Sequence, residues 1–182
     1  MAADITLRDA AEADFAAIQT IYAHHVLHGT GTFEEVPPDL AEMTRRWRDV
    51  RGKGFPWLVA AAQGRVVGYA YANHFRPRSA FRFSCEDSIY LAPDWAARGV
   101  GTRLLSALVD RCTAAGARQM LAVIGDSANQ GSVRLHARCG FVPVGTMRDV
   151  GLKFGRWLDV VFMQRALGAG AAPLSPSIAP AP

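Results

Sequence analysis

Lysine is scarce in this sequence of 182 residues, which contains only Lys53 and Lys153. A phosphate-binding P-loop needs a lysine after the spacing G-x-x-x-x-G, and neither lysine follows such a run. The formal charge of +4 comes mostly from scattered arginines, without a lysine-rich block or an aromatic–basic repeat. A P-loop is therefore excluded, and nucleic-acid binding is not expected.

Cysteine is also rare, with three examples and no C-x-x-C spacing. The odd number and the wide separation favour reduced thiols that are buried or incidental. Because no two cysteines lie at a metal-ligand spacing, the sequence predicts no metal site. The three residues are Cys85, Cys112 and Cys139.

Long apolar runs are missing as well. The longest, from 57 to 72, is broken by the triplet Gln63-Gly64-Arg65, which excludes a membrane span. The first nine residues lack a positively charged segment followed by an apolar one, so no secretory signal is expected. We therefore expect a cytoplasmic protein with no membrane partner.

The chain does have enough hydrophobic sequence for one core. With 50% hydrophobic residues at this length, one domain over residues 1–168 is the simplest organisation. Residues 169–182 are small and proline-rich, so we expect a disordered tail that carries no chemistry.

Hydrophobic periodicity divides the domain into strands and helices. Asp9 and Glu12, three residues apart, predict a capping box at the start of the first helix. The order of elements predicts an α+β domain in which helices flank a mixed, mostly antiparallel sheet. The expected elements are a strand at 5–7, helices at about 9–29 and 40–50, strands at 56–62, 66–73 and 81–91, a helix through 104–112, a strand at 119–124, a helix at 129–139, and strands at 141–146 and 157–167.

The stretch from Ser88 to Leu105 is the most informative part of the chain. It has the pattern of a strand, a stop at Pro93, a glycine-bearing turn and an apolar helix. Free N–H groups and the positive end of the helix dipole meet at such a turn, which suits a phosphate. A dinucleotide-binding fingerprint would require a third glycine at Leu104. Taken alone, the remaining R-G-x-G run is equally consistent with a plain tight turn.

The run P-D-W-A-A-R-G-V-G, from Pro93 to Gly101, resembles the pyrophosphate loop of the GNAT N-acetyltransferases. Three further segments, in the same order, resemble the phosphinothricin and methionine sulfoximine acetyltransferase branch of that family. The resemblance covers about residues 4–167, and it implies the GNAT fold, acetyl-coenzyme A (acetyl-CoA) as co-substrate and a homodimer. The segments are E-D-S-I-Y-L-A-P, N-Q-G-S-V-R-L-H-A-R-C-G-F and V-G-L-K-F-G-R-W-L-D-V-V-F-M-Q.

The resemblance also assigns coenzyme-binding residues. It implies that backbone groups of Ile89, Tyr90 and Leu91 pair with the pantetheine arm as an added strand would, and that one N–H polarises the acetyl oxygen. The chain departs from the family at Ala96 and Ala97, where relatives often carry Gln or Arg and then Gly. The residues implied to hold the pyrophosphate are Ala97, Arg98, Gly99, Val100, Gly101 and Thr102, with a charge-assisted contact from Arg98.

Glu86 is the candidate general base. It lies three residues before Ile89, on the opposite face of the strand, near the apolar residues Phe83 and Cys85. Desolvation there would raise the pKa of the carboxyl and let it accept the proton of an amine. The family places its proposed base at this position, whereas spacing alone favours a solvated glutamate. Asp87, on the other face, is the reserve candidate.

His136 occupies the position at which many GNAT members keep a tyrosine that protonates the departing sulfur. We expect an auxiliary role in proton transfer, with packing or capping as the alternative. Asn129 matches the coenzyme-contacting asparagine of the family, and an N-cap explains it equally well. Cys139 lies three residues after His136, so a covalent acetyl-cysteine is a further alternative to direct transfer.

The acceptor site is expected around an arginine-rich loop close to Glu86 in the sequence. Arg76 and Arg82, with Arg78 between them, offer bidentate contacts to carboxylate, phosphinate or sulfonyl oxygens. Surface solubility is the competing explanation for this loop. Phe81 and Phe33 are candidates for the pocket wall, and composition alone would place them in the core.

Together these features predict direct acetyl transfer to the α-amine of a small amino-acid analogue, such as phosphinothricin, methionine sulfoximine or methionine sulfone. Two alternatives remain open. One keeps the chemistry with a polyamine, an aminoglycoside or a peptide N-terminus as acceptor. The other is a coenzyme A-binding module without turnover.

Overall fold

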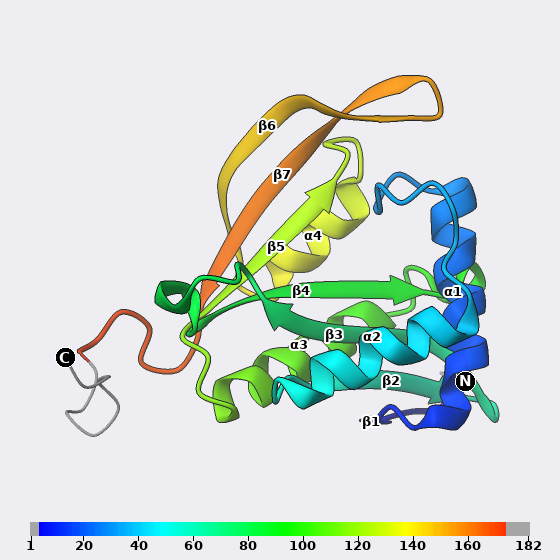
Figure 1. The fold of residues 1–182 in the computed structure, drawn as a ribbon, viewed down its shortest axis with the longest axis horizontal. Coiled ribbons are helices and arrows are strands. Elements are labelled where there is room, and N and C mark those ends of the chain that lie inside the picture. Colours follow the sequence, from blue (N-terminus) through cyan, green and yellow to red (C-terminus); the bar gives the residue numbers. More distant parts are fainter. Residues whose placement is uncertain (1–3, 174–182) are drawn as a thin grey trace.

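The computed structural model describes residues 4–173, and its centre is one seven-stranded sheet (Figure 1). The strand order is β1-β2-β3-β4-β5-β7-β6, and only β4 and β5 are parallel neighbours. This confirms the predicted mixed, mostly antiparallel sheet. The strands are β1 (Ile5–Asp9), β2 (Trp57–Ala62), β3 (Arg65–His74), β4 (Ser84–Leu91), β5 (Gln119–Gly125), β6 (Val142–Lys153) and β7 (Arg156–Ala166).

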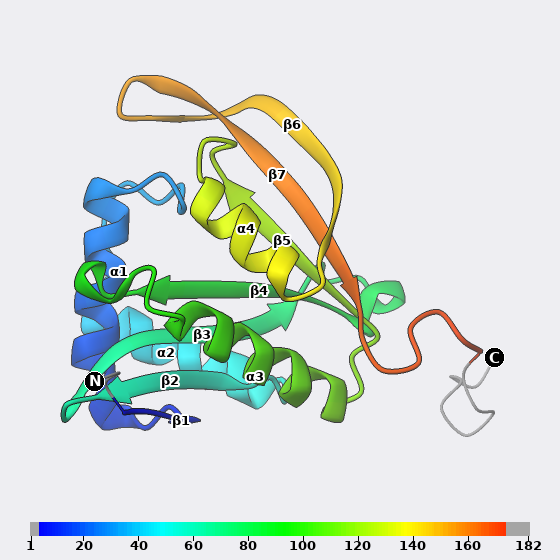
Figure 2. The same cartoon turned by 180° about the vertical axis from the view of Figure 1, so that it is seen from behind.

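Four helices cover the two faces of this sheet. α1 and α2 pack on one face, whereas α3 and α4 lie on the opposite face, which Figure 2 shows in front. None of the described helices is both long and apolar enough to cross a membrane. The helices are α1 (Phe15–His28), α2 (Leu40–Gly52), α3 (Val100–Ala114) and α4 (Gln130–Arg138).

The sequence patterns explain why these elements form. On α3, every residue predicted to face the core is buried, in agreement with the helical spacing. Between β2 and β3, Gln63 and Gly64 both have positive φ, the geometry of a two-residue hairpin turn. All three cysteines are free and buried, as expected. The buried residues on α3 include Leu104, Leu105, Leu108, Val109 and Cys112.

The start of the first helix differs from the prediction. The carboxylate of Asp14, not a capping box of Asp9 and Glu12, accepts the free N–H of Ala11 at 2.8 Å. Asp9 instead binds Arg111, 102 residues away in the sequence. A local pattern cannot anticipate a partner that the tertiary fold supplies.

Two other boundaries also differ. Residues 79–81 form a turn of 3-10 helix, so β4 begins at Ser84 and not at 81. β6 continues to Lys153 and joins β7 through a tight turn at Phe154 and Gly155, both with positive φ. Of the predicted tail, residues 174–182 lie outside the described residues. The carbonyls of Gly170 and Ala172 accept hydrogen bonds from Arg118.

Candidate active site

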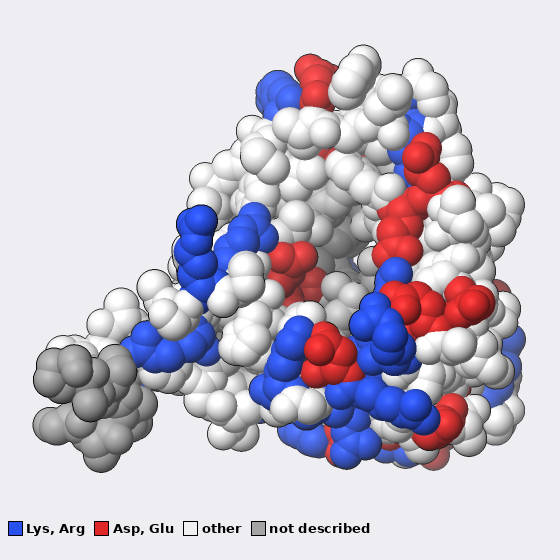
Figure 3. Space-filling model, in the orientation of Figure 1, with Lys and Arg blue, Asp and Glu red and all other residues white. Residues whose placement is uncertain are grey.

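A cleft opens where β4 and β5 stop pairing. The two strands are parallel neighbours as far as Asp87 and Ala122 and no further. β4 continues to Leu91 beside β3 alone, and β5 continues to Gly125 beside β7 alone. The strands therefore diverge into a fork (Figure 1). A cleft of about 990 Å³ lies at its opening. In Figure 3 the same face is hollowed near its centre, with acidic side chains in and beside the hollow.

Backbone direction on β4 decides which groups face this fork. Successive residues of a strand direct their N–H and C=O groups to opposite neighbours. The N–H of Ala92 donates to the Val67 carbonyl next to β3, at 2.9 Å, which fixes the alternation. Ile89 and Leu91 therefore point their backbone groups into the fork, where no strand pairs with them.

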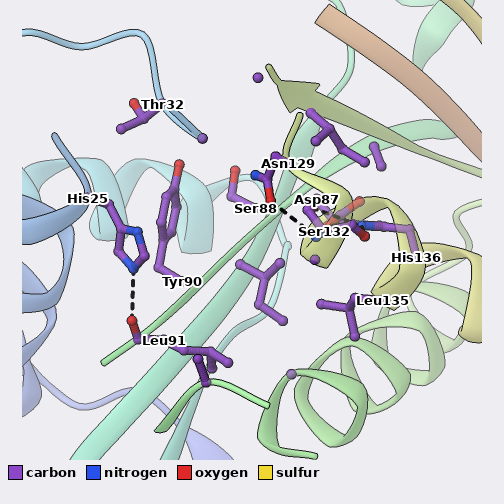
Figure 4. A pocket seen from close by; sticks show the side chains of 18 of the residues that line it. His25, Thr32, Asp87, Ser88, Tyr90, Leu91, Asn129, Ser132, Leu135 and His136 are labelled. Carbon is purple, nitrogen blue, oxygen red and sulfur yellow. Dashed lines mark hydrogen bonds and ion pairs between the residues drawn. The ribbon is translucent and has the colours of Figure 1, made fainter. Parts of the chain in front are cut away.

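Tyr90 corrects one expectation. It is paired with Tyr69, so its N–H and C=O groups face β3 and are not available to the fork. Its side chain lines the cleft instead, with ring contacts to Tyr22 at 4.9 Å and to His25 at 5.4 Å between centroids. The His25 Nε2 donates to the Leu91 carbonyl at 2.8 Å (Figure 4). The free groups at the fork are therefore both of Ile89 and the N–H of Leu91.

The loop before α3 forms the second wall of the cleft. Ala97 and Gly99 have φ of 57° and 79°, and such left-handed turns present successive N–H groups to one side. The first N–H groups of α3 have no acceptor within the helix, and the positive end of its dipole lies here. Gly101 and Thr102 also line the cleft. The turn and the helix start that the sequence predicted are present, and phosphate binding by them stays a prediction.

Two residues of this loop direct their side chains elsewhere. The Arg98 guanidinium lies over the Trp95 ring, 5.2 Å from its centroid, and Arg98 is not among the residues that line the cleft. Val100 is fully buried in the core. Neither residue lines the cleft, and the predicted charge-assisted contact of Arg98 would require its side chain to leave Trp95.

Glu86 lines the cleft beside the fork, and its side chain is half-buried. Burial raises the pKa of Glu86 to about 7, the nearby charge of Arg76 lowers it in part, and Asp87 adds to the rise. Within residues 4–173, the Glu86 carboxylate has no hydrogen-bond partner. A carboxylate with this pKa can accept a proton near neutral pH.

Asp87 and His136 form a buried pair behind the fork. Figure 4 shows His136 of α4 directed toward Asp87 of β4, and the His136 Nε2 lies 3.0 Å from an Asp87 oxygen. The His136 Nδ1 donates to the Ser132 carbonyl at 2.8 Å. Burial lowers the pKa of His136, but the Asp87 carboxylate and the Ser132 carbonyl outweigh it and the net shift is upward. Both ring nitrogens are therefore occupied inside the protein.

Two further residues singled out in the sequence, Asn129 and Cys139, flank α4 at its two ends. The Asn129 side chain accepts the Ser132 N–H at 3.2 Å, so the N-cap is confirmed, and Asn129 also lines the cleft. Cys139 is buried, with its sulfur 3.9 Å from the Ser106 hydroxyl, whereas the His136 nitrogens bind other groups. A thiol–imidazole pair is therefore absent from this described helix.

The predicted acceptor residues are separated in space. Phe33 lines the cleft, whereas Arg76, Phe81 and Arg82 are not among the lining residues. Arg76 is nevertheless close enough for its charge to lower the Glu86 pKa. Phe81 lies in the exposed 3-10 turn and packs edge-on against Phe75.

Several cleft residues were missed by the sequence interpretation. His25 and Thr32 line the cleft from segments that carry no recognised motif, and Ser132 does so from the segment N-Q-G-S-V-R-L-H-A-R-C-G-F, in which it was not singled out. Lys153 is almost fully buried and holds the loop that contains Thr32. The one available signal was a lone lysine inside the apolar segment V-G-L-K-F. In the described part of the chain, no group of three or more His, Cys, Asp or Glu side chains is placed to hold a metal.

Comparison with known proteins identifies the family of this fold and cleft. Residues 17–141 match the model of the acetyltransferase (GNAT) family. The chain belongs to the acetyltransferase (GNAT) family. This membership confirms the predicted fold and the predicted class of enzyme.

Individual relatives narrow the branch of the GNAT family. The chain is 54% identical over 165 residues to a phosphinothricin N-acetyltransferase from Alcaligenes faecalis, covering 91% of this chain and 84% of that protein. It is 44% identical over 161 residues to an L-methionine sulfoximine/L-methionine sulfone acetyltransferase from Pseudomonas aeruginosa, covering 87% and 92%. A phosphinothricin acetyltransferase from Sinorhizobium meliloti, solved in complex with acetyl-CoA, has a TM-score of 0.91 and 51% identity, covering 96% and 93%.

Proposed function

We propose that this GNAT protein transfers acetyl from acetyl-CoA to the α-amine of a small amino-acid analogue such as phosphinothricin, methionine sulfoximine or methionine sulfone. The observation that carries the proposal is the composition of β4. Within six residues this strand supplies the unpaired backbone groups of Ile89 and Leu91 and the carboxylate of Glu86, whose pKa is about 7. β4 alone thus supplies both the backbone groups that would bind the coenzyme and the carboxylate that can accept a proton.

The residues of the cleft fit acetyl-CoA. When bound, this co-substrate supplies an activated acetyl thioester. The free backbone groups of Ile89 and Leu91 would pair with its extended pantetheine arm, as an added strand would. The N–H groups from Ala97 to Thr102 would hold its diphosphate at the start of α3. An N–H of the fork would also polarise the acetyl carbonyl oxygen.

Glu86 is the proposed base for the acceptor amine. A free amine is the nucleophile, so the ammonium form of the acceptor must lose a proton before attack. The Glu86 carboxylate takes that proton, because its raised pKa makes it a stronger base than a solvated glutamate. Direct transfer follows, since Cys139 is buried away from a histidine nitrogen.

Charge favours an anionic head on the acceptor. Arg46 already binds both Glu34 and Glu42, at 2.7 and 2.8 Å, so its charge is neutralised. Arg76 has no carboxylate partner within the described residues, and its charge reaches Glu86. The Arg76 guanidinium donates to the Phe75 carbonyl at 2.9 Å and lies over the Phe75 ring, and its remaining N–H groups would suit the carboxylate, phosphinate or sulfonyl group of an amino-acid analogue.

His136 supports this chemistry in an auxiliary way. Its hydrogen bond to Asp87 ties α4 to β4 at the level where β4 and β5 separate, and its bond to the Ser132 carbonyl of the same helix orients the ring. Direct protonation of the departing sulfur would require His136 to break one of these bonds. We therefore assign His136 to positioning of the fork, with proton transfer as the secondary possibility.

We also propose a homodimer, for which β6 provides the surface. β6 is an edge strand of the sheet, and nearly all of its residues are exposed. A long exposed apolar edge is normally covered by a partner. Its exposed apolar side chains include Val142, Val144, Met147, Val150 and Leu152.

The test is incubation with acetyl-CoA and a panel of amines while the release of free thiol is measured. The panel contains phosphinothricin, methionine sulfoximine, methionine sulfone, a polyamine, an aminoglycoside and a peptide with a free N-terminus. Release with the amino-acid analogues alone supports the proposal. Release with the cationic amines alone would replace it with the second acceptor class, and coenzyme binding without release would indicate a binding module.

A further inference from the structure

Lys153 is an unusual interior residue. It ends β6, only 2% of its surface is exposed, and its ammonium donates to the carbonyls of Gly29 at 2.9 Å and Thr32 at 2.8 Å. These acceptors lie more than a hundred residues earlier in the chain. The other lysine, Lys53, is at the surface and pairs with Asp49.

Burial of this ammonium is costly, so its position requires a compensating role. Desolvation lowers the pKa of Lys153, and the charges of Glu35 and Glu34 partly restore it. No carboxylate within the described residues forms an ion pair with Lys153, and two backbone carbonyls satisfy two of its three donors. A methionine would fill the same space in the interior without the free-energy cost of a buried charge.

The two carbonyls belong to the first and the last residue of the segment 29–32. We call residues 29–33 the strap. The Thr30 hydroxyl donates to Asp126 at 2.9 Å, which fixes the middle of the strap to the end of β5. Gly31, Thr32 and Phe33 line the cleft. The strap therefore crosses from α1 to β5 and β6 as the outer wall of the cleft (Figure 1).

Phe33 is held in a slot between two glycines. A Cβ at Gly125 would lie 2.9 Å from the Phe33 ring, and a Cβ at Gly151 would lie 2.2 Å from it. No larger residue fits at either position without displacing the ring. The slot accepts the ring only while the strap keeps its present course, and Lys153 sets that course two residues beyond Gly151.

We propose that Lys153 is a positioning residue that fixes the strap and thereby shapes the acceptor side of the cleft. This inference rests on the proposed acetyl transfer to an amino-acid analogue. Among the described residues, the hydrogen bonds of Lys153 go to the strap and not to β4 or the loop before α3, so we expect its loss to affect the acceptor side more than the coenzyme side. Loss of the ammonium releases both ends of the strap and lets Phe33 leave its slot.

The test compares Lys153→Met with Lys53→Met, since the chain offers one buried and one exposed lysine. In Lys153→Met we expect the KM for phosphinothricin to rise at least tenfold, while the KM for acetyl-CoA stays within twofold. In Lys53→Met both constants stay at the wild-type value. Equal acceptor KM values in the two variants would overturn the proposal. Lys153→Arg, which keeps the charge, should recover part of the lost affinity.

Amide hydrogen exchange provides a readout that does not depend on activity. Peptides that cover residues 29–35 should exchange at least tenfold faster in Lys153→Met than in Lys53→Met, whereas peptides from β4 should not change. If the wild-type enzyme acetylates none of the amino-acid analogues, the proposed function fails, and the exchange result still decides the role of Lys153. Unchanged exchange in the strap would overturn that role.

A second variant covers the case in which Lys153→Met does not fold. Gly151→Ala leaves the lysine intact and pushes its Cβ into the Phe33 ring. We expect the acceptor KM to rise as in Lys153→Met, while the KM for acetyl-CoA stays within twofold of the wild-type value. A wild-type acceptor KM in folded Gly151→Ala would show that the strap does not shape the site.

Discussion

The two sides of the cleft are built in different ways. The proposed coenzyme side consists of main chain: the fork at Ile89 and Leu91, and the loop from Ala97 to Thr102. The proposed acceptor side depends on side chains from distant parts of the sequence, among them Glu86 in the cleft and Lys153 behind the strap. A backbone site can bind the same coenzyme throughout a family, whereas a side-chain site can change its acceptor through single substitutions.

The largest effect should come from Glu86→Gln. Loss of the base is expected to lower kcat by about 10²- to 10⁴-fold, with the acetyl-CoA dissociation constant unchanged, because the coenzyme side is main chain. In the wild type, kcat/KM should rise as the pH passes about 7, as the carboxyl loses its proton, and Glu86→Gln should lack this rise. Steady-state kinetics between pH 5.5 and 9 measure both. Glu12→Gln, at an exposed carboxylate that pairs with Arg48, is the control.

Arg76 gives the next effect and sharpens the comparison on the acceptor side. Arg76→Met should raise the acceptor KM by about 10- to 100-fold, since a charge-assisted hydrogen bond contributes about 1.5–3 kcal/mol. It should also raise the pKa seen in the rate profile, because the Arg76 charge now lowers that of Glu86. Arg78→Met is the matched control in the same loop. If both variants raise the acceptor KM equally, the specific role of Arg76 is refuted.

A smaller effect concerns stability. The pKa of Glu86 is about 7 in the folded state and near 4.5 when unfolded, so the folded state binds the proton more tightly. Stability from this group is therefore present at low pH and lost as the pH rises toward and past 7. Relative to the wild type, Glu86→Gln should gain about 2–4 °C in Tm between pH 5 and pH 8, the shift that roughly 1 kcal/mol produces. Calorimetry at the two pH values tests this, and a Tm difference that is independent of pH would contradict it.

The smallest effect belongs to the coenzyme loop. Ala97 has φ of 57°, where a Cβ is strained by about 1 kcal/mol or more, so Ala97→Gly should raise Tm by about 1–3 °C. The acceptor KM should not change. Ala96→Gly is the control, because Ala96 has φ of −64° and gains nothing from glycine. Equal responses of the two variants would show that the loop is not strained at Ala97.

The sequence predicted the strand, turn and helix of the proposed coenzyme side well because the signals for them are local. A strand, a proline stop, a glycine turn and an apolar helix follow one another between Ser88 and Leu105, and the structure forms them in that order. The sequence alone could not predict which backbone groups of β4 face the fork. Only the register with β3 shows that Tyr90 faces away from the fork.

The acceptor side was predicted poorly for the same physical reason. Lys153 acts through carbonyls 121 and 124 residues away, and no periodicity or spacing encodes such a contact. The partner of Asp9 is similarly remote, which is why its predicted capping box does not form. Of the predicted acceptor residues, Phe33 lines the cleft, and its slot depends on two glycines from different strands.

The most direct test is a crystal structure of the protein soaked with acetyl-CoA. The pantetheine arm should run along β4 and pair with Ile89 and Leu91 but not with Tyr90. The diphosphate should lie on the N–H groups from Ala97 to Thr102, and the acetyl group should face Glu86. A diphosphate bound at any other place, or an arm that makes no contact with Ile89, would contradict the account.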